Sequence, residues 1–210
     1  RGASRGARAL PLDGARALAP HKAPPVVRVL SESAGQWAHS AGAKSHPADV
    51  VLVGGVLNEW GIDWEPALRT ILEVCASDAL IVIVEPAIPE TARRLMALRE
   101  ALLADTTTIA PCTHGAACPL LALRKDWCFT THAAKFPGPV RDLAERLHHQ
   151  TSHVRYALWS FRAGAAAAPF GVDPARHARV VTDAMDGEQV LCLDGATQRE
   201  RAPHPAWPRG

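Results

Sequence analysis

Residues 109–129, with the sequence IAPCTHGAACPLLALRKDWCF, contain most of the side chains in this chain that are suited to thiol or metal chemistry. Three of the five cysteines, Cys112, Cys118 and Cys128, fall within this window, together with His114. Free cysteines are usually buried singly as small apolar side chains, so a cluster of this density needs a specific cause. The residues indicate either metal-bound thiolates or disulfides.

The number and spacing of the cysteines favour a metal. Five is an odd number, and no signal-peptide segment precedes the cysteines, so we do not expect a secreted disulfide framework. The spacings C-x5-C and C-x9-C are wider than the C-x2-C knuckles of ordinary structural zinc sites. We expect the fourth thiolate to come from Cys192. Cys75 lies on the apolar face of a predicted helix, and we expect it to be a buried core residue.

Apolar runs in the first half of the chain predict the elements that position this window. Residues 26–30, 50–57 and 79–84 predict β-strands, and helical spacing of apolar residues predicts helices at 64–76 and 89–103. Continuous apolar runs are typical of parallel strands that are covered on both faces. We therefore expect an α/β fold, a doubly wound parallel sheet with helices packed on both faces.

Polar residues follow the predicted strands, at the edge of the sheet where ligands of doubly wound folds bind. A binding site for S-adenosylmethionine at this edge would use a set of five acidic or amide residues: Asp13, Glu32, Asn58, Glu59 and Glu85. Such a site normally begins with a glycine-rich turn after the first strand, and no G-x-G occurs before Val26. Loops after strands are often polar simply because they are solvated, so both interpretations stay open.

The C-terminal part of the chain predicts a small β meander. The Asp-Gly pairs at 186–187 and 194–195 each separate β-prone runs, and Asp-Gly is a strong hairpin signal, so we expect three strands within 177–202. The middle strand carries Cys192, and a shared metal would pin this meander to the 109–129 loop. We expect one α/β domain at 1–165, which includes the loop, and a β extension at 170–210.

The charge of the chain does not by itself indicate a polyanionic partner. The 23 basic and 21 acidic residues give a formal net charge of +2, so any RNA contact would use a local patch. A predicted helix within 136–147 and its surroundings provide such a patch: Arg124, Lys125, Lys135, Arg141, Arg146, His148 and His149. A solvated helix face is the alternative explanation. No run of about eighteen apolar residues occurs, so we expect no membrane-spanning helix.

Several blocks of the sequence resemble one family, the methyltransferase-like proteins of the mitochondrial small ribosomal subunit. The blocks are VLVGGVLNEW, LIVIVEPAIPETARRLMALREALL, APCTHGAACPL, DWCF, KFPGPVRDLAERL and VRYALWSF, and the resemblance covers about residues 26–202. It implies a degenerate class I methyltransferase-like (Rossmann-like) sheet with a cysteine-rich metal-binding loop. It also implies a [4Fe–4S] cluster held by Cys112, Cys118, Cys128 and Cys192, a ligand set that suits such a cluster chemically.

Two positions depart from the family pattern, Thr113 in the Pro-Cys block and Phe129 after Trp127-Cys128, and neither change removes a thiolate. The resemblance implies a component or assembly factor of the mitochondrial small ribosomal subunit, with ribosomal RNA and ribosomal proteins as partners and no membrane or DNA partner. The expected location is the mitochondrial matrix, in keeping with the Arg-rich, acid-free first twelve residues, with the bacterial cytoplasm as the alternative.

Two other functions stay open from the sequence. One is an active S-adenosylmethionine-dependent rRNA methyltransferase, although the missing glycine loop leads us to expect an inactive fold with no catalytic residue. The other is a protein-interaction module stabilised by zinc in the same four cysteines.

Overall fold

The structure of this chain is a computed structural model that describes residues 33–40, 44–59, 63–149, 152–164, 177–182, 186–193 and 195–201. The chain divides into the units Arg1–Glu32 and Ser33–Gly210, and all described residues belong to the second unit. The predicted strand at 26–30 and the candidate residues Asp13 and Glu32 lie outside the described residues. The domain boundaries at 165 and 170 stay a prediction.

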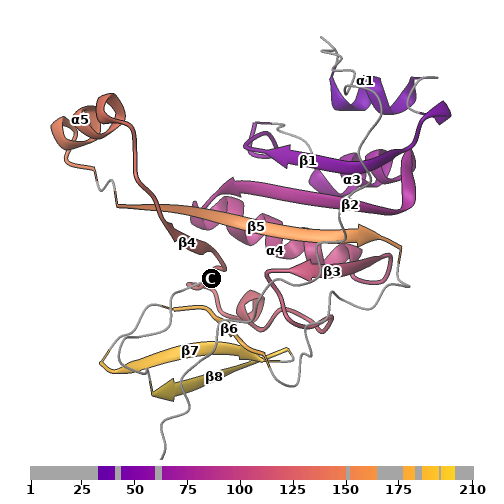
Figure 1. The fold of residues 1–210 in the computed structure, drawn as a ribbon. Helices are drawn as coiled ribbons and strands as arrows, with labels where there is room; N and C mark the ends of the chain where they lie inside the picture. Colours follow the sequence, from indigo (N-terminus) through magenta and orange to yellow (C-terminus); the bar gives the residue numbers. More distant parts are fainter. Residues whose placement is uncertain are drawn as a thin grey trace, which may run out of the picture. The chain divides into compact units, whose positions relative to one another are not determined.

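A five-stranded sheet forms the centre of the described unit (Figure 1). Its main path has the order β1 (Ala48–Gly54), β2 (Cys75–Pro86), β5 (His153–Ala163) and β3 (Thr106–Ala110), and β4 (Thr130–Ala133) also pairs with β5. Strands β1 and β2 are parallel, as predicted for the runs at 50–57 and 79–84. The mixed α/β architecture is consistent with a Rossmann-like fold.

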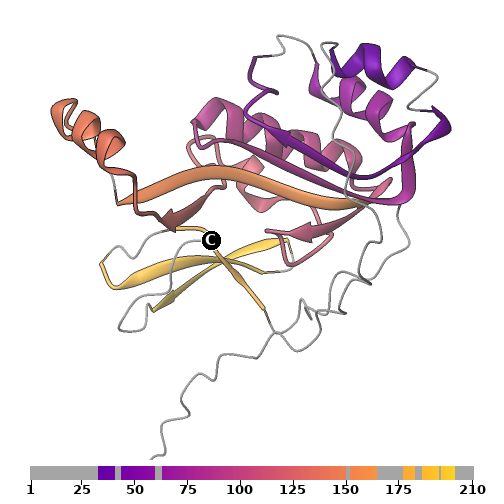
Figure 2. The same cartoon turned by 45° about the horizontal axis from the view of Figure 1, so that its top comes forward.

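Two helices pack on one face of this sheet, and Figure 2 shows them on the same side. These are α3 (Trp64–Leu72) and α4 (Pro89–Leu102), which correspond to the predicted helices. Their apolar residues form one core with alternate residues of the central strands: Leu68, Ile71, Leu95, Leu98 and Leu102 from the helices, and Val53, Ile81, Ile83, Trp159 and Phe161 from the strands. Burial of these side chains is the main stabilising term for this unit.

The prediction of an all-parallel sheet with helices on both faces is wrong in two respects. Strand β5 is antiparallel to β2, β3 and β4, so one reversed strand lies inside the sheet. The face opposite α3 and α4 is partly open among the described residues, because Val50 is 55% exposed and Leu52 is 76% exposed. Apolar side chains on both faces of a strand do not reveal whether anything covers the second face.

The remaining elements extend from this sheet. Helix α1 (Ala34–His39) begins with a capping box in which Ser33 and Gln36 bond each other's backbone. Helix α5 (Gly138–Arg146) connects β4 to β5 and has no buried residue. None of the helices in the described part of the chain is long and apolar enough to cross a membrane.

A second, three-stranded sheet contains β6 (Arg179–Val180), β7 (Glu188–Leu193) and β8 (Ala196–Arg201). Both strand pairs are antiparallel, which confirms the predicted meander, and Cys192 lies on its middle strand β7.

Cys75 is not on a helix, because α3 ends at Leu72 and Cys75 begins β2. Its thiol donates to the carbonyl of Ile71 at 3.1 Å, and the side chain is half-buried against the core.

Candidate metal centre

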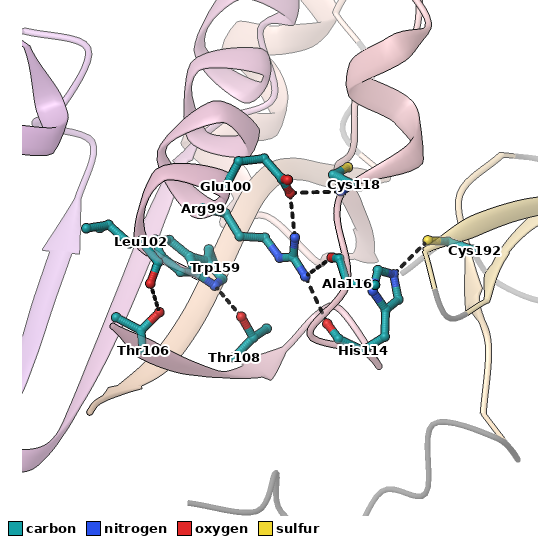
Figure 3. Close-up of polar contacts among 10 residues, drawn as sticks. All are labelled: Arg99, Glu100, Leu102, Thr106, Thr108, His114, Ala116, Cys118, Trp159 and Cys192. Carbon is teal, nitrogen blue, oxygen red and sulfur yellow. Dashed lines mark hydrogen bonds and ion pairs between the residues drawn. The ribbon is translucent and has the colours of Figure 1, made fainter. Parts of the chain in front are cut away.

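The C-terminal half of α4 fixes the segment that carries Cys112 and Cys118 (Figure 3). Arg99 is buried and donates from Nη2 to the carbonyls of His114 at 2.8 Å and Ala116 at 3.0 Å. The neighbouring Glu100 accepts from the backbone N–H of Cys118 at 2.8 Å and from Arg99 Nη1 at 2.8 Å. One ion pair on the helix therefore holds the backbone between the first two cysteines.

The segment that leads to Cys128 is held by the same helix. Arg93 donates to three carbonyls of this segment, those of Leu121, Leu123 and Asp126, at 3.0, 2.7 and 2.6 Å. The backbone N–H of Cys128 points at Met96 Sδ at 3.3 Å. The 3-10 helix η1 (Pro119–Ala122) lies between the two segments and buries Leu120. The loop is thus ordered by polar contacts to α4 more than by its own apolar residues.

The C-terminal sheet brings Cys192 to this loop. Cys192 packs in a small apolar cluster with Met96, Leu120 and Val181, and Cys118 and Cys128 are packed against the same cluster. Its Sγ lies 3.3 Å from His114 Nε2 (Figure 3). Gly195, at the β7–β8 turn, has φ +80°, and a Cβ there would lie 2.8 Å from Ala116 Cβ. Only glycine allows this close approach of the turn to the loop.

The structure therefore brings the four predicted cysteines together and leaves Cys75 apart from them. One small cavity beneath α4 is lined by Cys112, Cys118 and Cys128. Negative charge on any of these three thiols raises the pKa of Cys192. The first three cysteines come from one loop, and Cys192 comes from a hairpin more than sixty residues further along the sequence. This gathering is the structural feature that any function of the site has to explain.

Burial disfavours the thiolate form of three of the four cysteines, Cys112, Cys118 and Cys192. Burial raises the pKa of Cys112 to about 11, and burial followed by the neighbouring cysteines raises the pKa of Cys192 to about 12. Burial also raises the pKa of Cys118. Cys112 and Cys192 are therefore protonated near neutral pH, and a metal must displace those protons to bind.

Two buried guanidinium groups face the cysteines, and both side chains belong to residues that are 3% exposed. Arg99 and Arg179 each lower the pKa of Cys112, which shows that their positive charges act on the site. Arg99 is paired with Glu100 at 2.8 Å. Within the part of the chain that the structure describes, no carboxylate pairs with Arg179. Buried cations are stable only when opposite charge compensates them, so the surroundings suit an anionic group.

Four cysteine thiolates are a ligand set that both a [4Fe–4S] cluster and a structural zinc ion can use. Among the described residues, no three His, Cys, Asp or Glu side chains converge on a point where one ion would be held. A structural zinc site requires four ligands at one ion. A [4Fe–4S] cluster bound by four cysteines takes one thiolate at each iron, so its ligands surround a volume. Three of the four cysteines, Cys112, Cys118 and Cys128, line the cavity, and Cys192 packs in the apolar cluster beside them.

The candidate residues for a methyl-donor cofactor have structural partners instead. Glu85 is buried at the end of β2, and its Oε1 accepts from the backbone N–H groups of Val56 at 3.1 Å and Leu57 at 3.0 Å. Asn58 Oδ1 accepts from Thr91 Oγ1 at 3.0 Å, which ties the turn after β1 to α4. Glu59 is exposed. Glu85 and Asn58 therefore do lie at one edge of the sheet, where they hold the chain in place.

Replacing Glu85 with alanine should destabilise the fold, because two buried N–H groups lose their acceptor. Each unsatisfied buried group costs about 1–3 kcal/mol. Urea unfolding is the measurement, with Glu59→Ala as the exposed control on the same turn. A Glu85→Ala protein as stable as the Glu59→Ala protein would show that Glu85 is not needed for the turn.

Two residues of the site, Arg99 and Arg179, were not predicted from the sequence as functional, and His114, which the sequence placed in the cysteine window, is the neighbour of Cys192. The burial of Arg99 could have been predicted from the sequence, because Arg99 lies on the apolar stripe of α4 between Leu95 and Leu102, where a charged residue needs a partner. The sequence carries no such signal for Arg179, because its burial follows from the packing of the C-terminal sheet on the loop.

Residues 29–202 match a family model with the description mitochondrial small ribosomal subunit Rsm22. No curated protein matches the chain. The matched range covers all of the described residues, from the helix at Ala34 to the last strand of the meander.

Proposed function

The chain belongs to the mitochondrial small ribosomal subunit Rsm22 family, and from that premise we propose that it is a component or assembly factor of this subunit with a structural [4Fe–4S] cluster. Membership implies a function associated with the mitochondrial small ribosomal subunit. The cluster, direct binding of ribosomal RNA, a matrix location and the lack of methyltransferase activity are the finer parts of the proposal.

The observation that carries the cluster proposal is the gathering of Cys112, Cys118 and Cys128 around one cavity, with Cys192 packed in the adjoining apolar cluster and buried guanidinium groups beside them. The four thiolates would hold the cluster, and the bound cluster would supply a covalent tie between the loop and the C-terminal sheet. Binding free energy of this kind becomes folding free energy, because the ligands are far apart in the unfolded chain. The cluster's role is therefore structural, and no step of catalysis is assigned to it.

The proposal of an inactive fold rests on the polar residues at the edge of the sheet. Glu85 Oε1 holds the backbone of the β1 turn and Asn58 Oδ1 accepts from Thr91, so these two atoms already have protein partners, whereas Glu85 Oε2 is buried without one. Zinc in the same four cysteines is the alternative, and the metal content of the purified protein distinguishes the two.

Exposed cations support the RNA part of the proposal. All seven basic residues that the sequence marked are exposed, including Arg141 and Arg146 on α5 and Arg124 and Lys125 after η1. Helix α5 also carries Asp142 and Glu145, so its charge is mixed. Long flexible cations of this kind bind phosphates without reading base sequence.

Changing Arg141 and Arg146 together to glutamate is expected to weaken binding to small-subunit ribosomal RNA and to reduce its salt dependence. Each lost phosphate contact lowers the slope of log affinity against log salt by about one unit. The measurement is filter binding of the purified protein to the RNA across a salt series. The matched control changes two exposed arginines of β8, Arg199 and Arg201, to glutamate. If both double variants lose affinity equally, the loss reflects net charge and the α5 surface is not the RNA contact.

A further inference from the structure

We propose that Arg179 is a positioning residue for the iron–sulfur cluster, because it bonds one ligand sulfur and supplies the buried positive charge that offsets the thiolates. This inference rests on the proposed function, since it assigns a role toward the cluster to a residue outside the ligand set. The contacts that Arg179 makes in this structure carry the inference.

The contacts of Arg179 orient it toward two of the four ligands. Its Nε donates to Cys128 Sγ at 3.1 Å, and its Nη2 donates to Thr130 Oγ1 at 3.1 Å. Arg179 is also the residue on β6 that pairs with Cys192 on β7. One side chain therefore spans from the strand that faces Cys192 to the loop that ends at Cys128. Its planar fork fixes both contacts at once.

The charge of Arg179 has no other explanation within the described part of the chain. Arg179 is 3% exposed, and its Nη1 is buried without a hydrogen-bond partner. No carboxylate of the described residues pairs with its guanidinium group. Arg99 provides the contrast, since its charge is paired with Glu100 and its donors hold backbone carbonyls. A buried, uncompensated cation is strongly destabilising, and thiolates bound to a metal supply the missing negative charge. Arg99 organises the loop, and Arg179 compensates the cluster.

The expected consequences follow from general properties of metal sites. Hydrogen bonds to the ligand sulfurs and the net charge nearby help set the reduction potential of an iron–sulfur cluster. Partners in the outer shell of a metal site typically change metal affinity by about ten- to a hundredfold when they are removed. Loss of the positive charge disfavours the reduced cluster, which carries one more negative charge, so the midpoint potential should become more negative.

The experiment compares Arg179→Gln and Arg179→Lys with the wild-type chain, all purified anaerobically. The measurements are iron and acid-labile sulfide per chain, the rate of iron loss to a chelator, and the midpoint potential from a spectroscopic redox titration. We expect Arg179→Gln to lose iron about ten- to a hundredfold faster than wild type and to have a more negative midpoint potential. Arg179→Lys keeps the charge and should recover most of the lost retention.

The control is Arg199→Gln, an exposed arginine of the same sheet, which should match wild type in every measurement. Two results overturn the inference: an Arg179→Gln protein with wild-type iron loss and potential, or an Arg179→Lys protein as poor as Arg179→Gln, which would assign Arg179 a packing role. If Arg179→Gln does not fold, as judged by circular dichroism, the lysine variant decides between these outcomes. Wild-type protein without iron would instead contradict the proposed function, so the two failures are distinguishable.

Discussion

A chain in which Cys192 is replaced by serine should lose most of its iron and much of its stability. Cys192 is the only proposed ligand on the C-terminal sheet, and it otherwise meets the loop through a small apolar cluster with Met96, Leu120 and Val181 and through its contact with His114. The binding free energy of a structural metal is on the order of 10 kcal/mol, comparable to the whole stability of an ordinary domain. The variant should therefore be metal-poor, unfold at lower temperature and fail to sediment with the small subunit.

The matched control is Cys75→Ser, which removes a thiol that packs against the core of the main sheet and lies apart from the four cysteines. This variant should retain wild-type iron, with at most a small loss of stability. Iron per chain, thermal unfolding and sedimentation on a sucrose gradient are the measurements. Full iron content in the Cys192→Ser protein would contradict the assignment of Cys192 as a ligand.

Replacing Trp159 with alanine should lower the free energy of unfolding by about 3–5 kcal/mol, the usual range for removing a large aromatic residue from a core. Trp159 is almost completely buried on β5 and stacks on Phe161 with ring centroids 4.0 Å apart. Its indole N–H donates to Thr108 Oγ1 at 3.3 Å, which links β5 to β3 (Figure 3). Urea unfolding of the protein with its metal content matched to wild type is the measurement.

The control for Trp159 is Leu52→Ala on the opposite face of the same sheet. Leu52 is 76% exposed, so its truncation should change stability by less than about 0.5 kcal/mol. A large loss of stability in Leu52→Ala would show that this face is covered in the folded protein. A loss in Trp159→Ala no greater than in Leu52→Ala would contradict the placement of the core between the sheet and helices α3 and α4.

The sequence was sufficient to predict the elements whose patterns are local. The apolar runs located β1 and β2, the helical spacing located α3 and α4, and the Asp-Gly pairs located the meander. Strand β3 was missed, because three threonines at 106–108 carry little apolar signal although Thr106 and Thr108 are buried. The prediction that Cys75 lies on a helix was wrong, because the helical spacing of apolar residues continues in the sequence past the point where the chain enters β2.

Features that depend on long-range pairing were not predictable from local patterns. The reversed direction of β5 depends on its pairing with β2 and β3, which lie far from it in sequence. The sequence left Glu85 open between cofactor binding and an ordinary polar loop, and it could not show that Glu85 Oε1 accepts from the backbone of the β1 turn, a contact between segments far apart in sequence. The four cysteines were predicted as a set from the family blocks. Arg179 became visible beside them only once the loop and the C-terminal sheet were seen together, whereas Arg99 on the apolar stripe of α4 already carried a signal.

The metal content of anaerobically purified protein tests the central proposal most directly. Iron and acid-labile sulfide should each be present at about four per chain, the composition of one [4Fe–4S] cluster. The brown colour and broad visible absorption of an iron–sulfur protein should accompany them and be lost in the Cys192→Ser variant. Zinc without iron would keep the four ligands and contradict the cluster, and protein without any metal after anaerobic reconstitution with iron and sulfide would contradict the metal centre itself.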